Sequence, residues 1–365
     1  MNKQKLDIIY GALLHDIGKV LFRCHDTRVS HSQSGAKWLN EIGISDNNII
    51  DQIRYHHAQE IRNTNSKLAS DSLAFITYWA DNVAAGADRR DSVDNQGSRT
   101  YKRDMALESV FNILNGNKDK YRYMFGLVNE DGEINYPVNE TRTISAEKYS
   151  EILDNLKDLI KGADIDEKNI NSFLEVLEAN LTFVPSSTDT NQICDVSLFD
   201  HIKITSAVAS SVYDYLVEQG NSNYRDILYK KGDEFYNENA FLLCSMDISG
   251  IQNFIYTISS SKALKNLRAR SFYLEIMMEH IVDQLLAELE LSRANLLYTG
   301  GGHAYLLLPN TSKCRNVIDD FGKRLNHWLM HTFGIDIYMA IGYAECKLND
   351  PPELVHRSTH HVAQE

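Results

Sequence analysis

The chain has 365 residues, of which 43% are hydrophobic and 24% charged, and its formal net charge is −13. This length predicts about two to three domains, and the composition is that of a soluble globular protein. The sequence has no apolar stretch long enough to cross a bilayer and no signal-peptide pattern, so we expect a cytoplasmic protein without a membrane partner.

Charge and cysteine positions narrow the class of protein further. Phosphate binding needs clustered Lys and Arg, so an acidic chain argues against extended nucleic-acid binding. Residues 1–110 hold 14 basic and 14 acidic side chains, so any nucleic-acid contact is expected to be local or shared with partner proteins. The five cysteines are scattered without a CxxC pair, which argues against a disulfide framework and a cysteine zinc site.

The first 110 residues carry only helical patterns. Apolar side chains recur with helical spacing over 3–22, and further helices are predicted at about 32–43, 46–60 and 70–88. No segment alternates like a strand, so residues 1–110 are predicted to form an all-helical domain. The charged, aperiodic stretch 88–104 is predicted to be an exposed loop.

Two more regions follow, and they differ in pattern. Helices return over about 146–232, with a break at 185–191, and predict a helical linking domain across 111–235. Residues 236–365 then show a strand at 240–249, a helix at about 262–290, a hairpin at 294–310, a helix at about 313–333 and a strand at 336–346. This βαββαβ order is that of a ferredoxin-like unit, so the predicted fold class is multidomain α+β.

Histidines and aspartates gather in the first domain. His15 and Asp16 are adjacent in an apolar pattern, where such a pair is costly to bury unless its polar groups are satisfied. The other predicted helices supply further candidate metal ligands, which are His31, His56, His57, Asp81 and Asp88. Any one of these residues alone is better explained as a helix cap, a surface charge or a satisfied core polar group.

As a set, the same residues favour metal chemistry. Imidazole and carboxylate together suit manganese, iron, cobalt, nickel or zinc. Two such ions bridged by an aspartate can activate water and stabilise the leaving oxygen of a phosphodiester. Lys19, one turn beyond His15, could neutralise a phosphate oxygen.

The ferredoxin-like region has a second, weaker constellation. Asp247 ends its first predicted strand, where polymerase-like and cyclase-like palms hold magnesium on a nucleotide triphosphate, and Ser249 and Gly250 follow it. The hairpin turn at 300–303 has no carboxylate, and one aspartate is too few for two magnesium ions. Nearby cations could meet triphosphates or an RNA backbone, or form a solvated helix face; they are Lys262, Lys265, Arg268 and Arg270.

The segment "GALLHDIGK" resembles the signature of the HD superfamily of metal-dependent phosphohydrolases. With "HSQSGAKWL", "RYHH" and "ITYWADNVAAGADRR" in order, the chain more narrowly resembles the large subunit of type III-A CRISPR effector complexes. That family's HD domain cleaves single-stranded DNA with transition-metal ions such as manganese, nickel or cobalt. The resemblance implies metal ligands at His15, Asp16, His31, His56, His57 and Asp81, and a catalytic role for His15 and Asp16, with Lys19 beside them.

"DISGIQNFIY", "SKALKNLRARSFYLE" and "RANLLYTGGGHAYLL" resemble the first palm of the same subunit, and "VPSSTDTNQICDVSLFDHIKITSAVA" its linking segment. In that family a second palm with a GGDD turn joins the first to convert ATP, with magnesium, into cyclic oligoadenylate. The sequence contains no GGDD, so we expect part of a longer protein that contacts ATP but makes no product alone. The implied nucleotide-binding residues are Asp247, Ser249, Gly250, Lys262, Lys265, Arg268, Gly300, Gly301, Gly302 and His303.

The resemblance also implies partners. These are a small helical subunit, a subunit holding the 5′ end of the guide RNA, the guide and target RNAs, and a single-stranded DNA substrate. Two other functions stay open: a stand-alone HD phosphohydrolase acting on small nucleotides, and a non-catalytic scaffold of a ribonucleoprotein. A stand-alone phosphohydrolase would have no evident use for the palm, and the intact pair at His15 and Asp16 disfavours a non-catalytic scaffold.

Two further histidine patterns are predicted to be structural. Asp200 and His201 form a second acid–histidine pair, expected to cap and bridge helices, although it could support the metal site from a neighbouring domain. The residues at 356, 360 and 361 have metal-like helical spacing, but a fraying terminal helix explains them better.

Overall fold

A computed structural model describes residues 1–24, 29–63, 68–88, 100–124, 136–140, 142–162, 164–256 and 263–349. The chain divides into two compact units, Met1–Ala209 with Asn223–Lys230, and Ser210–Ser222 with Lys231–Glu365. The predicted domain boundaries near residues 110 and 235 stay predictions. Within the described ranges, no helix is long and apolar enough to cross a membrane. Lys262, the histidines at 356, 360 and 361, and most of the loop predicted at 88–104 lie outside those ranges.

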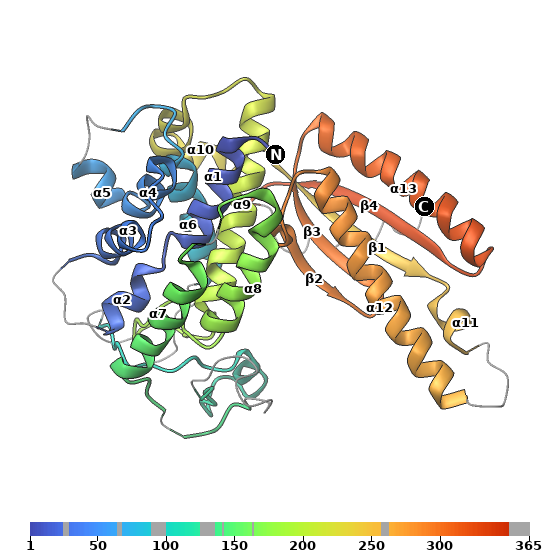
Figure 1. Cartoon of the computed structure of the whole chain (residues 1–365), viewed down its shortest axis with the longest axis horizontal. Coiled ribbons are helices and arrows are strands. Elements are labelled where there is room, and N and C mark those ends of the chain that lie inside the picture. Colours follow the sequence, from blue (N-terminus) through green and yellow to red (C-terminus); the bar gives the residue numbers. More distant parts are fainter. Residues whose placement is uncertain are drawn as a thin grey trace. The chain divides into compact units, whose positions relative to one another are not determined.

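The first unit is helical (Figure 1). Its α-helices are α1 (Lys3–Leu14), α2 (Gly18–Cys24), α3 (His31–Glu41), α4 (Asn47–Arg54), α5 (Ala58–Asn63), α6 (Ala74–Asp88), α7 (Ala146–Ile160), α8 (Ile170–Leu181) and the first part of α9 (Leu198–Glu218). Short 3-10 turns at Val110–Asn115 and Glu167–Asn169 and a π-helical turn at Arg225–Lys230 complete it. Side-chain caps begin several helices; for example, the Asn2 side chain accepts a hydrogen bond from the Lys5 N–H at 2.8 Å.

Two of the predicted helices are each broken in two. The prediction of one helix over 3–22 is wrong, because α1 ends at Leu14 and α2 begins at Gly18. The connecting turn is tightened by a hydrogen bond from the Ile17 N–H to the Leu14 carbonyl at 3.1 Å. The helix predicted over 46–60 likewise divides into α4 and α5, and the break holds His56 and His57. Both breaks therefore fall at the candidate metal ligands.

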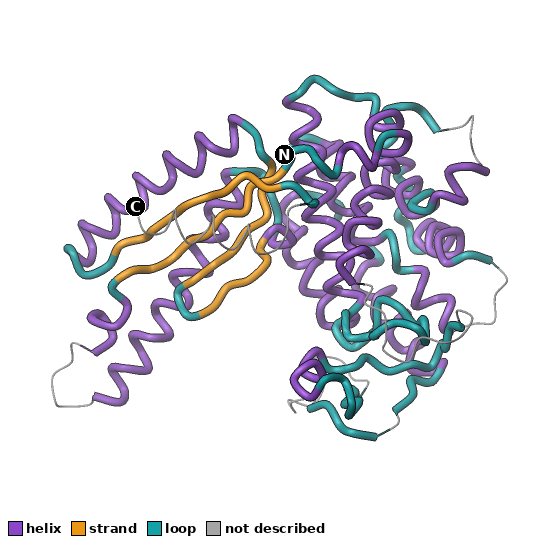
Figure 2. The backbone as a smooth tube through the Cα atoms, turned by 180° about the vertical axis from the view of Figure 1, so that it is seen from behind, coloured by secondary structure: helices purple, strands orange, loops and turns teal. Residues whose placement is uncertain are grey.

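The second unit contains the predicted ferredoxin-like fold. Its elements are α10 (Gly232–Phe235), β1 (Phe241–Ser249), α11 (Ile251–Tyr256), α12 (Ala263–Glu288), a 3-10 turn (Arg293–Asn295), β2 (Leu296–Gly300), β3 (His303–Pro309), α13 (Ser312–Phe333) and β4 (Tyr338–Cys346). The strands form one sheet in the order β2-β3-β1-β4, and every neighbouring pair is antiparallel (Figure 2). The α+β fold class and the βαββαβ order are confirmed.

One face of this sheet makes the core of the second unit. Alternate residues of β1, from Leu242 to Ile248, are buried with residues of β3, α12 and α13 such as Leu306, Val282 and Ile318. The intervening β1 residues are only partly buried, and Asp247 is one of them. The period of two along β1 therefore places Asp247 on the face away from this core.

Candidate metal centre

Seven histidine and aspartate side chains meet inside the first unit. They form two groups whose ligand atoms lie within 4.8 Å of one another, namely His15, Asp16, Asp81 and His201, and His31, His56 and His57. The six residues predicted from sequence are therefore all brought together, from the α1–α2 turn, α3, the α4–α5 break and α6. The seventh, His201, comes from α9.

Two aspartates connect the groups. Asp16 Oδ2 lies 3.4 Å from His15 Nε2 and 3.2 Å from His201 Nε2, while its Oδ1 lies 3.3 Å from His31 Nε2. Asp81 repeats this arrangement, with Oδ1 3.1 Å from His201 Nε2 and Oδ2 3.9 Å from a ring nitrogen of His57. Each carboxylate thus offers one oxygen to each group, which suits a centre of two bridged ions.

Hydrogen bonds orient the buried histidine rings. His15 Nδ1 and His56 Nδ1 each lie 2.7 Å from a main-chain carbonyl, of Ala12 and Ile53 respectively, and therefore act as donors. This tautomer leaves the Nε2 lone pair of each ring directed inward, as metal-binding histidines require.

The inward atoms of the centre are poorly satisfied by hydrogen bonds from the described residues. His15 Nε2, His56 Nε2, His201 Nε2 and both Asp16 oxygens are buried and make no hydrogen bond of normal geometry with the described residues. Unsatisfied buried polar atoms are costly, and divalent ions bound at the two groups would satisfy them once His201 gives up its proton. The mixed imidazole–carboxylate set fits a divalent transition metal better than magnesium or calcium.

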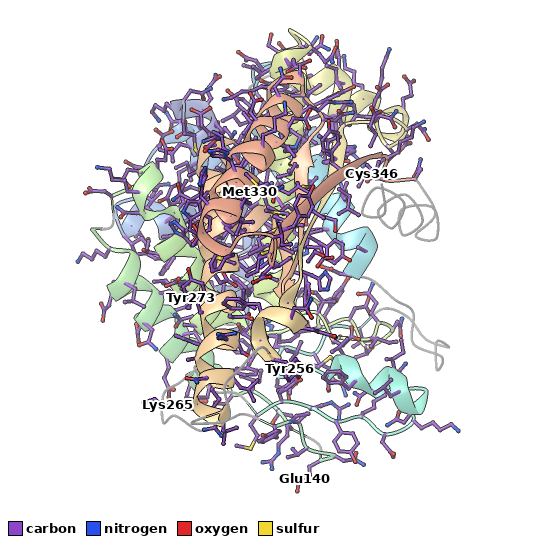
Figure 3. The ribbon with its side chains drawn as sticks, turned by 90° about the vertical axis from the view of Figure 1, so that its right-hand side faces the viewer. Glu140, Tyr256, Lys265, Tyr273, Met330 and Cys346 are labelled. Atoms are coloured by element: carbon purple, nitrogen blue, oxygen red, sulfur yellow. The ribbon has the colours of Figure 1, made fainter. Side chains whose placement is uncertain are left out.

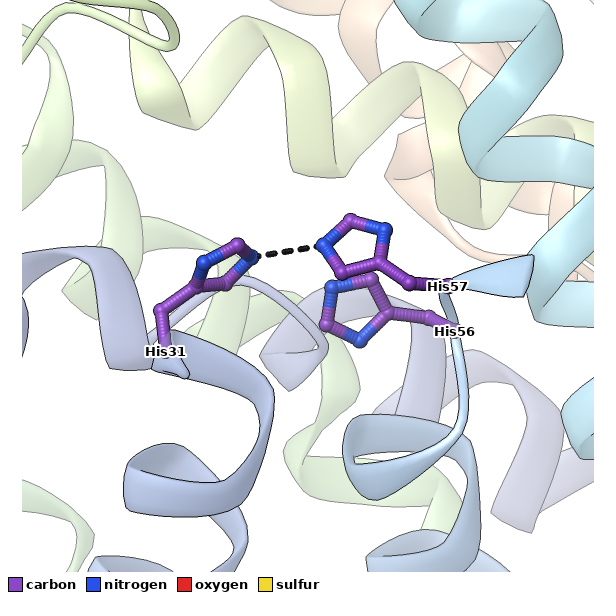
Figure 4. A group of neighbouring side chains, drawn as sticks. All are labelled: His31, His56 and His57. Atoms are coloured by element: carbon purple, nitrogen blue, oxygen red, sulfur yellow. Dashed lines mark hydrogen bonds between the residues drawn. The ribbon is translucent and has the colours of Figure 1, made fainter. Parts of the chain in front are cut away.

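The second group is partly open. His31 Nε2 and His57 Nε2 lie 2.8 Å apart and point toward each other, and the His56 ring lies beside His57, with centroids 4.0 Å apart and the rings tilted by 55° (Figure 4). Burial and the neighbouring His56 lower the pKa of His57 to about 4, so His57 is neutral at pH 7. A neutral imidazole is the ligand form, and this group therefore needs to lose no proton from His57 before it binds a metal.

In the first group, by contrast, neighbouring charges favour the charged forms of the side chains. Burial opposes ionisation of Asp16, but the Lys19 ammonium and nearby imidazoles outweigh it and hold the pKa of Asp16 well below its usual range. Lys19 Nζ forms an ion pair with Asp16 Oδ2 at 2.5 Å. Burial also opposes protonation of His201, yet Asp16, Asp81 and Asp88 together raise its pKa to about 10. A proton on His201 thus balances the carboxylates in the absence of a cation.

Sequence patterns alone give too little weight to His201 and Asp88. His201 is 2% exposed, and its Nδ1 lies 2.7 Å from Asp88 Oδ2 while its Nε2 faces Asp16 and Asp81. This carboxylate–histidine arrangement orients a metal ligand and raises its basicity. Asp200, by contrast, accepts a hydrogen bond from Ser197 at 2.7 Å and is exposed, so only one member of the pair is structural. The one available signal was a polar pair near the start of a long apolar helix.

The residues predicted to bind a nucleotide are only partly brought together. Asp247 and His303 are cross-strand partners, with Asp247 Oδ1 3.1 Å from His303 Nδ1. Gly250 has φ +89°, and a Cβ there would lie 1.9 Å from the Asp336 carbonyl oxygen, so backbone packing requires this glycine. Gly300, Gly301 and Gly302 form the turn between β2 and β3, and Ser249 ends β1.

The cations lie on another element of the second unit. Lys265 and Arg268 belong to the first turns of α12, and Figure 3 labels Lys265 near the start of that helix. Among the described residues, neither side chain makes a hydrogen bond or ion pair with the hairpin turn. Arg270 instead donates to the Phe254 carbonyl and lies over the Phe254 ring, 5.1 Å from its centroid. Arg270 therefore has a structural role in joining α11 to α12.

These features define the class of protein: a helical HD-type centre for divalent metal ions, joined in one chain to a palm-like ferredoxin fold. Family models agree, because that of the HD domain matches residues 1–86 and that of Csm1 subunit domain B matches residues 240–362.

Curated relatives identify the family. The chain is 44% identical to the CRISPR system single-strand-specific deoxyribonuclease Cas10/Csm1 (subtype III-A) of Enterococcus italicus, over 96% of this chain and 48% of that protein. Its identity to the Mycobacterium tuberculosis protein of the same name is 41%, over 96% of this chain and 46% of that protein. Over 96% of its length the chain is similar to the Cas10/Csm1 proteins of type III-A CRISPR systems, which confirms the predicted family resemblance. It spans about half the length of the curated relatives it matches.

Solved structures are similar over the whole chain. A Csm1–Csm4 cassette in complex with pppApA matches with a TM-score of 0.77 and 27% identity, covering 100% of this chain and 49% of that one. The same kind of cassette in complex with one ATP matches with a TM-score of 0.75 and 26% identity, covering 100% and 48%.

Proposed function

We propose that this chain is the single-stranded DNA-cleaving part of a type III-A CRISPR effector subunit, acting through the HD-type centre of the first unit. The observation that carries this proposal is the buried centre itself, in which inward-facing atoms of His15, Asp16, His56 and His201 make no hydrogen bond of normal geometry with the described residues. The names of the curated relatives, which describe single-strand-specific deoxyribonucleases, support the substrate class.

The chain's own residues would divide the work as follows. His15, Asp16, Asp81 and His201 would hold one ion, and His31, His56 and His57 the other, with the two aspartates shared. Divalent ions there supply Lewis-acid activation of water and neutralise charge on a phosphodiester. Lys19, 22% exposed and already beside Asp16, would bind a phosphate oxygen at the opening of the site. We propose manganese, nickel or cobalt as the ions: the mixed imidazole–carboxylate ligands suit divalent transition metals, and the family resemblance implies these three.

The direct test is cleavage by the purified chain. Labelled single-stranded DNA would be incubated with the protein and manganese, nickel or cobalt, and products resolved on a gel. His15→Ala and Asp16→Ala are each expected to reduce the rate at least about a hundredfold, because each removes a ligand. His327→Ala, which removes an exposed histidine of α13, is the matched control and should cleave at the wild-type rate. Cleavage that persists in both site variants would refute the proposal.

For the second unit we propose ATP contact without synthesis. Asp247, beside His303 on the sheet face away from the core, would bind magnesium and the triphosphate, with Ser249, Gly250 and the 300–302 turn around it. The cassette solved with one ATP supports this ligand class.

Asp247→Ala should weaken binding of Mg-ATP in calorimetry at least about tenfold, while Asp233→Ala on α10 should not. The chain alone should form no cyclic oligoadenylate, and detection of that product would contradict the role given to the acid-free turn.

We further propose that the chain assembles into a guide-RNA complex with a small helical subunit and a subunit that holds the 5′ end of the guide. The solved relatives in complex with Csm4 support a protein partner of this kind. Co-purification of the tagged chain with co-expressed complex subunits and guide RNA would test it. Assembly of the other components without retention of this chain would oppose it.

A further inference from the structure

A cavity of about 380 Å³ adjoins the metal centre inside the first unit. Part of its lining belongs to the centre and includes His31, His57 and Asp81. The rest comes from outside the centre, and includes Phe22, Arg23, Tyr101, Ser186, Thr188 and Gln192. This volume lies within the usual range for small-ligand pockets, about 300 to 1,000 Å³. The cavity can therefore hold more than the reacting phosphate.

The segment 186–192 that lines this cavity is fixed by backbone hydrogen bonds. The Ser186 N–H donates to the Val196 carbonyl at 2.9 Å, and the Lys102 N–H donates to the Thr188 carbonyl at 3.0 Å. The Thr190 N–H donates to the Thr100 carbonyl at 2.9 Å. These bonds hold the segment in place against residues 100–102, so its side chains are positioned before any ligand binds.

Several polar groups of the lining are not used by the protein. Ser186 and Thr188 are 6% and 9% exposed, and their hydroxyls make no hydrogen bond with the residues that the structure describes. Arg23 is also 6% exposed, and its Nη1 has no partner there. The side-chain carbonyl oxygen of Gln192 accepts a hydrogen bond from the Ser187 hydroxyl at 2.9 Å, which leaves the side-chain N–H groups of Gln192 for a ligand. The two hydroxyls and the Gln192 amide can thus bind a polar ligand in the cavity, and a partner for the buried Arg23 Nη1 would remove the cost of an unsatisfied group.

Aromatic rings accompany these polar groups. Phe22 lines the cavity, and its ring is contacted by the Arg103 guanidinium, 4.4 Å from the centroid. Tyr101 is 60% exposed, and a backbone bridge to Asp189 ties it to the 186–192 segment. An accessible aromatic ring offers any base a stacking surface without reading its identity.

We propose that Phe22, Arg23, Tyr101, Ser186, Thr188 and Gln192 form a nucleoside subsite, which binds one unstacked, unpaired nucleotide beside the phosphate held at the metal centre. The proposal deepens and rests on the proposed function, since it explains why the substrate would be a single strand. A paired base cannot enter a cavity of this kind unless it is first flipped out of its duplex, whereas a base of a single strand enters at little cost.

Binding without metal tests the subsite directly. Fluorescence anisotropy would follow a labelled oligothymidylate titrated with the full chain in EDTA. Tyr101→Ala and Gln192→Ala should each raise the Kd at least about fivefold, as expected for the loss of one stacking or hydrogen-bonding contact. Tyr101→Phe keeps the ring and should bind within about twofold of wild type. Binding of a duplex, which does not use the subsite, should be the same in all four proteins.

The controls separate this proposal from the proposed function. Tyr136→Ala and Gln219→Ala remove exposed residues of the same types outside the cavity and should bind as wild type. If Tyr101→Ala and Gln192→Ala bind and cleave single strands as wild type does, the subsite is refuted while the nuclease stands. If they lose binding but wild type cleaves DNA with none of the metals, the subsite stands and the nuclease fails.

Discussion

At the residue scale, the centre depends on which ring nitrogen of each histidine faces inward. Main-chain carbonyls of Ala12 and Ile53 fix His15 and His56, while a side-chain carboxylate, that of Asp88, fixes His201. Asp88 can therefore be tested by mutation, which a main-chain carbonyl cannot. It also carries charge, so it affects both the orientation and the proton affinity of His201.

Asp88→Asn should weaken manganese binding about tenfold to a hundredfold, because a neutral amide orients His201 less firmly and makes it less basic. Isothermal titration calorimetry measures the change. The matched control is Asp200→Asn, which alters a carboxylate next to His201 in sequence that instead accepts from Ser197. Equal affinities for Asp88→Asn and wild type would show that Asp88 does not act on the metal.

Metal binding should release protons and become tighter as the pH rises. The pKa of His201 is raised to about 10 in the metal-free protein, so its ring is protonated at pH 7 and must lose that proton to bind an ion. The pKa of His57 is lowered to about 4, so His57 releases none. Calorimetry at about pH 7.5 in buffers of different ionisation enthalpy should detect at least about one proton released per protein. Affinity that is independent of pH between about 6.5 and 8.5 would contradict this assignment.

At the element scale, breaks in two helices build the site. In a continuous helix over 3–22, Asp16 would lie on the same helix as the core residues. The turn after Leu14 instead changes the direction of the chain at Asp16. Gly18 makes the redirected helix possible, because a Cβ there would lie 1.8 Å from the His31 carbonyl oxygen. The close packing of α2 on α3 in turn places His31 beside Asp16, with Nε2 and Oδ1 3.3 Å apart.

Gly18→Ala should lower the free energy of unfolding by about 1 to 3 kcal/mol, since the new methyl group must push the backbone of α3 away. It should also weaken metal binding, because His31 moves with that backbone. Gly86→Ala in α6 is the matched control: nothing lies within 4 Å of its added Cβ, so the change should stabilise by about 0.5 to 1 kcal/mol. Urea denaturation measures the free energy of unfolding of both variants. A Gly18→Ala protein as stable as wild type would show that the contact is easily relieved.

At the scale of the whole molecule, the two units should respond differently to metal. All seven candidate ligands lie in Met1–Ala209, so metal binding should stabilise the first unit. Manganese at a hundred times its Kd stabilises a site by about 2.7 kcal/mol. Hydrogen exchange should therefore slow in α1, α3 and α6 but not in β1 to β4. Asp16→Ala should abolish the effect, and equal protection of both units would contradict this assignment.

Local patterns predicted much of this architecture. The βαββαβ order and most element positions followed from apolar periodicity, because burial on one face imposes that period along each element. The strand at Phe241–Ser249 is an example: from Cys244 onward its apolar residues alternate with polar ones, and the apolar residues are the buried ones. Periodicity could not predict the helix breaks at 15–17 and 55–57, since the apolar pattern continues across them.

By itself, the sequence determined the class of fold, the family and six of the seven candidate metal ligands, because these depend on local patterns and short motifs. Only the tertiary structure decided that His201 joins the centre and that Asp88, 113 residues away, orients it. It also decided that the segment 186–192 lines a cavity beside the metal ligands. The physical reason is the same in each case: these contacts join residues far apart in the chain, and only packing of the helices brings such residues within hydrogen-bonding distance.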